Sequence, residues 1–102
     1  MKGINLMDEK SILQIEAAVF RTLRDHLRNR TDVQNIDMMN TTGFCRNCLG
    51  RWYKASAHEL GIEITKEESQ KIVYGMPASE WKNQFQIEAT DDQKKLFKTG
   101  HT

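Results

Sequence analysis

Residues 8–29 have the sequence DEKSILQIEAAVFRTLRDHLRN, and this stretch decides the fold class. Its large apolar side chains recur every three or four residues, at Ile12, Ile15, Val19, Leu23 and Leu27. Because an α-helix turns once every 3.6 residues, this spacing gathers them on one helix face. We therefore predict a long helix that has Asp8 as its N-cap and ends near Asn29.

A short helix and a second long helix are expected next, and no segment alternates as a strand would. Thr31 or Asp32 should cap the short helix, which ends in the polar turn 40–42. The second long helix should run from about Gly43 to Leu60.

The second long helix has a start and a stop signal in the sequence. Thr42 is its expected N-cap, and Gly61 is a natural residue to end it.

Two capping boxes mark two further helix starts, T-x-x-E at 65–68 and T-x-x-Q at 90–93. Gly75 should end the first of these helices. Pro77 suits the first position of the next helix, which carries Trp81. The sequence therefore predicts an all-α fold, a compact array of five or six helices.

Length and composition indicate one domain over residues 1–102, since domains usually have about 100 to 150 residues. The net charge is +1, which argues against a strongly charged partner. No apolar run approaches the roughly 20 residues that span a bilayer, and residues 1–7 lack the apolar core of a signal peptide. We expect a cytoplasmic protein that is not bound to a membrane.

Both cysteines lie in one C-x-x-C motif, Cys45 and Cys48. If Thr42 is the N-cap, Cys45 occupies the third helical position, where free N–H groups favour a thiolate. This arrangement suits thiol redox chemistry or a metal ion such as zinc. Structural zinc needs four ligands, so a site would also need His26, brought close by tertiary packing, or a second pair of cysteines across a dimer axis.

The same cysteines also fit an ordinary apolar helix face together with Leu49 and Trp52. Redox C-x-x-C motifs usually follow a strand in a βαβ unit, and this sequence predicts no strand. The buried-core interpretation therefore stands beside the chemical ones.

Gly50 lies inside the predicted second long helix, where glycine costs about 1 kcal/mol relative to alanine. A closely packed neighbouring helix, from this chain or a second subunit, would justify it. We expect an interaction surface at the following residues: Arg46, Gly50, Arg51, Trp52, Tyr53 and Trp81. Nucleic-acid binding through Arg28, Arg46 and Arg51 is a weaker alternative, because the whole chain is near neutral.

No catalytic residue is predicted. The acid pairs 67–68 and 91–92 each fall in the first turn of an expected helix, where capping and the helix dipole explain them. The sequence has no Gly-rich phosphate loop, serine nucleophile elbow or H-E-x-x-H motif.

Three segments together resemble a family of short bacterial proteins catalogued as domain of unknown function 1244. They are the G-F-C-R-N-C-L-x-R-W-Y pattern of residues 43–53, Tyr74-Gly75-Met76-Pro77, and Glu80-Trp81-Lys82. The resemblance implies a small all-helical protein and brings no activity, cofactor or catalytic residue with it.

The leading hypothesis is a non-enzymatic accessory or protein-interaction module that forms a homodimer and has an unidentified protein partner. The alternative is a metal-binding or thiol-redox protein that uses Cys45 and Cys48.

Overall fold

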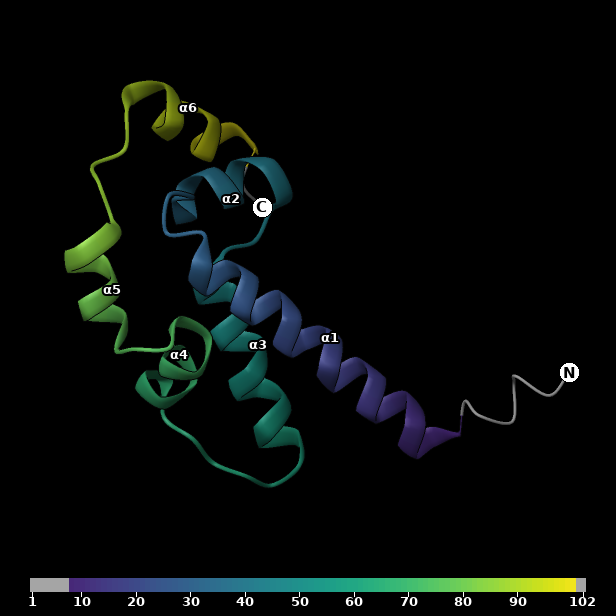
Figure 1. Cartoon of the computed structure of the whole chain (residues 1–102). Helices are drawn as coiled ribbons and strands as arrows, with labels where there is room; N and C mark the ends of the chain where they lie inside the picture. Colours follow the sequence, from purple (N-terminus) through teal and green to yellow (C-terminus); the bar gives the residue numbers. More distant parts are fainter. Residues whose placement is uncertain (1–7, 101–102) are drawn as a thin grey trace, which may run out of the picture.

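The computed structural model describes residues 8–100. Within that range the chain folds into six α-helices and no strand, which confirms the predicted all-α fold. In chain order the helices are α1 (Glu9–Asn29), α2 (Asn35–Thr42), α3 (Arg46–Glu59), α4 (Lys66–Tyr74), α5 (Ala78–Phe85) and α6 (Asp91–Gly100). The N-terminal part of α1 extends away from the other five helices (Figure 1). No helix of this part of the chain is long and apolar enough to cross a membrane.

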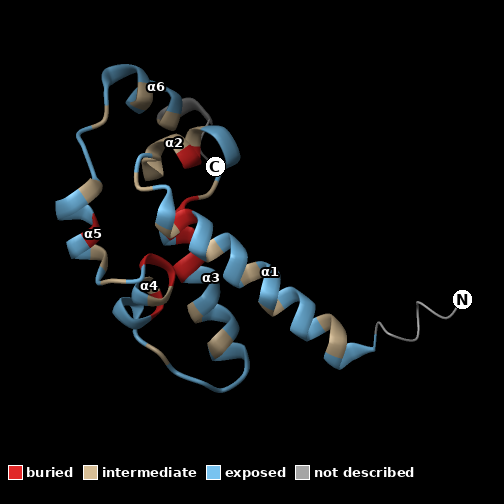
Figure 2. Ribbon diagram, viewed as in Figure 1, coloured by how far each residue is buried: buried red, intermediate tan, exposed pale blue. Residues whose placement is uncertain are grey.

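Helix α1 begins as predicted, because the Asp8 carboxylate accepts a hydrogen bond from the Ser11 N–H at 2.8 Å. Its apolar stripe is buried at one end only. Leu27 is 8% exposed and belongs to the core, whereas Val19 is 63% exposed. The outer turns of α1 therefore lie almost entirely in solvent (Figure 2).

The start of α2 differs from the prediction. Neither Thr31 nor Asp32 caps it; the N-cap is Gln34. Asp32 instead forms an ion pair with Arg30 at 3.0 Å. The Gln34 side chain donates to the backbone carbonyl of Phe85 and accepts from the backbone N–H of Ile87. It therefore ties α2 to the end of α5.

The start of α3 also differs. Gly43 has φ +83° and ends α2, so it is not part of α3. Thr42 is the last residue of α2 rather than an N-cap, and its hydroxyl donates to the Met38 carbonyl at 2.7 Å. Cys45 takes the N-cap position of α3.

Helices α3 and α4 pack against each other through Gly50, as its presence inside a helix suggested. A Cβ at this position would lie 3.6 Å from Cα of Gln70 on α4. Gly61 ends α3 as predicted, with φ +78°. The Gly61 N–H donates to the His58 carbonyl, and the Ile62 N–H donates to the Ala57 carbonyl. This pair of hydrogen bonds is the Schellman motif.

Both predicted capping boxes are present, at the starts of α4 and α6. Pro77 is the N-cap of α5 rather than its first helical residue. The Gln93 side chain donates to Asp37, and the Gln93 carbonyl accepts from Asn40, so α6 is held against α2. The described core lies where α1, α2, α3 and α4 meet. Its buried apolar residues are Leu27, Met38, Met39, Cys45, Cys48, Leu49 and Val73.

Candidate functional site

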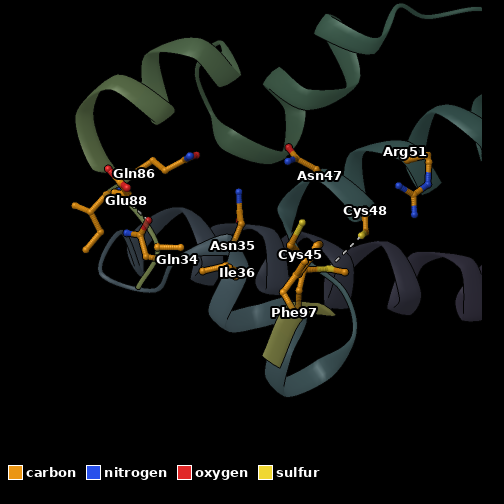
Figure 3. A pocket seen from close by; sticks show the side chains of 13 residues that line it. Gln34, Asn35, Ile36, Cys45, Asn47, Cys48, Arg51, Gln86, Glu88 and Phe97 are labelled. Atoms are coloured by element: carbon orange, nitrogen blue, oxygen red, sulfur yellow. Dashed lines mark hydrogen bonds between the residues drawn. The ribbon is translucent and has the colours of Figure 1, made fainter. Parts of the chain in front are cut away.

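A pocket of about 580 Å³ opens beside the first turn of α3. Its walls come from α2, α3, α6 and the segment between α5 and α6 (Figure 3). Cys45, Cys48 and Met39 line it together with the polar side chains of Asn47 and Arg51. The C-x-x-C motif that the sequence singled out therefore borders a pocket within the size range of small-ligand sites.

The local fold explains how both cysteines reach this pocket. Cys45 has an extended backbone, and its carbonyl accepts the first helical hydrogen bond from the Leu49 N–H at 3.1 Å. Cys48 lies three residues later, on the same side of the first turn. The expected third helical position for Cys45 is wrong, because the helix starts three residues later than the Thr42 cap implied.

Both thiols are free and buried, and they lie 4.0 Å apart. Burial raises the pKa of the Cys45 thiol, and the backbone N–H groups of Cys48 and Asn47 oppose that shift. The Cys48 thiol donates to Met39 Sδ at 3.8 Å. Both side chains therefore pack in the core, in keeping with the core interpretation.

Among residues 8–100, no three His, Cys, Asp or Glu side chains come together as a zinc site would require. His26 is exposed on the last turn of α1 and does not complete a ligand group with the two cysteines. The expected zinc set of cysteines with His26 is thus not assembled.

Beside the cysteines, Arg46 is fully buried at 1% exposure. Its guanidinium donates to the carbonyls of Leu27 at 3.0 Å, Arg30 at 2.7 Å and Val33 at 2.8 Å, and to Asn35 Oδ1 at 3.0 Å. Arg46 therefore closes the C-terminal end of α1 and the turn that follows it, since these carbonyls lack helical partners.

The positive charge of Arg46 is placed against an aromatic ring rather than in an ion pair. Its guanidinium lies 4.6 Å from the centre of the Trp81 ring, in a cation–π contact. Among the described residues, no carboxylate lies within 4.0 Å of it. Burial lowers the pKa of Arg46, while Tyr74, Cys45 and the more distant Asp32 carboxylate act in the other direction.

The six predicted surface residues separate into two groups. Arg46, Gly50 and Trp81 lie inside the molecule, and Arg51, Trp52 and Tyr53 lie at its surface.

The aromatic side chains of the surface group have neighbours within the chain. Trp52 stacks on Phe44 at 5.8 Å between ring centres, and Tyr53 packs against Phe20 of α1 at 5.9 Å.

The three arginines considered for nucleic acid do not act alike either. Arg28 reaches across to α4 and donates to the carbonyls of Ile72 and Val73. Arg46 is enclosed, and only Arg51 is both exposed and at the pocket.

Sequence reasoning missed Met39 and a chain of polar contacts around Tyr74. The Tyr74 hydroxyl donates to Asn47 Oδ1 at 2.6 Å and accepts from Asn35 Nδ2 at 3.0 Å. Met39 precedes Cys48 by nine residues on a different helix, so no regular spacing could have linked them.

Comparison with known proteins supports the resemblance read from the motifs. No curated protein matches the sequence. A family model described as "Protein of unknown function (DUF1244)" matches residues 33–99. This range contains α2 to α5, all of α6 but its last residue, and both cysteines, while α1 precedes it. The match spans about two thirds of the chain, and the chain therefore belongs to the DUF1244 family.

Proposed function

We propose that this protein is a non-enzymatic interaction module that associates with a second copy through the exposed apolar face of α1. The observation that carries the proposal is a row of exposed apolar side chains on one face of a helix that extends beyond the body. These are Ile15 at 47%, Val19 at 63% and Leu23 at 37% exposure. A contiguous apolar helix face in solvent is typical of an interaction surface.

Charge favours an antiparallel pair. Asp8, Glu9 and Lys10 give the start of α1 a net charge of −1, whereas Asp25, Arg28 and Arg30 give the region around its end a net charge of +1. Antiparallel pairing would bring the acidic end of one helix beside the basic end of the other, whereas parallel pairing would bring like charges together.

The spacing also suits this arrangement. With Val19 at the twofold axis, Ile15 of one copy faces Leu23 of the other. The 21 residues of α1 make a helix of about 31 Å, which is long enough for several such layers. A small domain gains stability when such a face is covered.

Sedimentation equilibrium of the full chain, over a hundredfold range of concentration, tests the proposal. We expect twice the chain mass for the natural protein and the mass of one chain for Val19→Asp, with unchanged helix content by circular dichroism. The matched control is Ile62→Asp, because Ile62 is an exposed apolar residue outside α1, at 54% exposure. This control should remain a dimer. A natural protein that stays monomeric throughout, or a dimeric Val19→Asp variant, would contradict the proposal.

Orientation can be tested separately by cysteine crosslinking. An Ile15→Cys variant mixed with a Leu23→Cys variant should crosslink to each other faster than either crosslinks to itself. Faster self-crosslinking of each variant would show a parallel pair instead.

A further inference from the structure

The pocket beside α3 brings three sulfur atoms together on its wall. Cys48 Sγ lies 3.8 Å from Met39 Sδ, and Cys45 lies 4.0 Å from Cys48. Figure 3 shows the two cysteine side chains next to each other at the start of α3, with the dashed contact running from Cys48. Two thiols and one thioether form a soft donor set, which is the kind that selects monovalent copper over harder ions.

The distances also suit a single ion. Sulfur ligands about 2.3 Å from a metal, a typical metal–thiolate distance, lie about 4 Å apart when three of them surround it in a plane. Two of the three separations, from Cys48 to Met39 and from Cys45 to Cys48, are close to that value. We propose that Cys45, Cys48 and Met39 bind one Cu(I) ion in a three-coordinate, all-sulfur site.

Binding releases both thiol protons: Cu(I) and two neutral thiols give a copper dithiolate with net charge −1 and two protons in solution. The neighbouring residue Arg46 favours that negative charge, because it is a buried cation whose hydrogen-bond partners are neutral carbonyls and an amide.

Ligand number favours a monovalent ion over zinc. Zinc would need a fourth ligand, and no third His, Cys, Asp or Glu joins the cysteines among residues 8–100. Three-coordinate copper needs only the three sulfurs already present.

The site has a route for the ion. Each of the three sulfur-bearing residues is buried, at 6% for Cys45, 7% for Cys48 and 9% for Met39, yet all three line the 580 Å³ pocket, which is open at the surface. The enclosure protects a bound Cu(I) ion from water and oxidants, and the opening allows exchange with a soluble copper carrier.

The test is an anaerobic competition titration of the reduced, untagged full chain against the Cu(I) chelator bicinchoninate, followed by the absorbance of the chelator complex. We expect one Cu(I) per chain. Met39→Leu keeps the side-chain volume but removes the sulfur, so affinity should fall about tenfold or more. The matched control is Met38→Leu, because Met38 is an equally buried neighbour that does not line the pocket; it should bind as the natural protein does.

Cys45→Ser and Cys48→Ser should each abolish competition with the chelator. X-ray absorption of the copper-loaded protein should give three sulfur neighbours at about 2.3 Å. The proposal is overturned if the chelator keeps all the copper, if Met39→Leu binds as tightly as Met38→Leu, or if absorption shows only two sulfur neighbours. The two methionine variants decide the matter even if a serine variant does not fold.

Discussion

The two ends of α1 share one apolar pattern and have opposite surroundings. At the inner end, Leu27 is buried, its carbonyl accepts from Arg46 at 3.0 Å, and Arg28 reaches across to α4. At the outer end, Ile15 and Val19 continue the same stripe into solvent. The difference teaches that an amphipathic repeat fixes which face of a helix is apolar, while the reach of the remaining chain decides how much of that face is covered.

Substitution of Arg46 should have the largest effect, because this side chain holds the inner end of α1 in place. Arg46→Met leaves the carbonyls of Leu27, Arg30 and Val33 without their buried donor. We expect a loss of about 4 kcal/mol in the free energy of unfolding, measured by urea denaturation. Arg46→Lys keeps the charge but not the planar set of donors, so it should lose roughly half as much.

The control for Arg46 is Arg51→Met on the same helix. Arg51 is exposed, so this change should alter the free energy of unfolding by less than about 0.5 kcal/mol. Equal losses for the two methionine variants would show that the buried hydrogen bonds of Arg46 do not stabilise the fold.

Substitution of one apolar residue by alanine at each end of α1 measures how much each end of the stripe stabilises the fold. Leu27→Ala should cost about 3 kcal/mol, because it leaves a cavity in the core. Val19→Ala should cost less than about 0.5 kcal/mol at concentrations where the chain is monomeric. A larger cost that grows with protein concentration would locate the stabilising contact of Val19 in a dimer.

Substitution of two glycines, Gly75 beside α1 and Gly50 in α3, should change the free energy of unfolding by an intermediate amount. Gly75 has φ +78°, and a Cβ there would lie 2.9 Å from Arg28 Nε. Gly75→Ala should therefore lose about 2 kcal/mol, from backbone strain and displaced Arg28 hydrogen bonds. Gly50→Ala is the matched control.

At Gly50 the backbone is helical, and the added Cβ would be in ordinary contact with Gln70 at 3.6 Å. Gly50→Ala should thus be neutral or stabilise by up to about 1 kcal/mol, as helix propensity predicts. Thermal melts of the two variants should move in opposite directions, and a shared decrease of similar size would contradict this assignment.

Much of the helical framework was predictable because its signals are local. The N-cap Asp8, the two capping boxes and the stops at Gly61 and Gly75 each depend on residues within a few positions. The start of α3 was not predictable in the same way, because Thr42 is a good N-cap residue. Here the hydroxyl bonds back to a carbonyl of α2, and the left-handed glycine after it separates the two helices.

The candidate site was only half predictable. The C-x-x-C pair stands out in the sequence, but its third sulfur comes from α2. Arginine is rarely buried without a carboxylate, so no local rule placed Arg46 inside. Its partners lie 11 to 19 residues earlier and are mostly backbone carbonyls, whose freedom to accept depends on how α1 ends.

The smallest expected effect is on how the free energy of unfolding depends on pH. Groups near the two ends of α1 should change this free energy at opposite extremes of pH and leave it unchanged at neutral pH. Near the inner end, burial raises the pKa of Cys45 and of Tyr74. The unfolded chain therefore loses these protons first as the pH rises. The stabilisation that depends on these two protons should be constant below about pH 8.5 and should fall above it, with a second contribution from Tyr74 above about pH 10.

At the outer end the sign is opposite. The N–H of Ser11 holds the pKa of Asp8 below its usual value, so the stabilisation from this cap is present above about pH 4 and is lost as the pH falls. Urea midpoints of the metal-free protein from pH 3 to pH 11 should show both slopes. Cys45→Ala should weaken only the alkaline slope and Asp8→Ala only the acidic one, because each removes a single group. If Cys45→Ala left the alkaline slope intact, the buried thiol would not be its source, and Tyr74→Phe would then have to remove it.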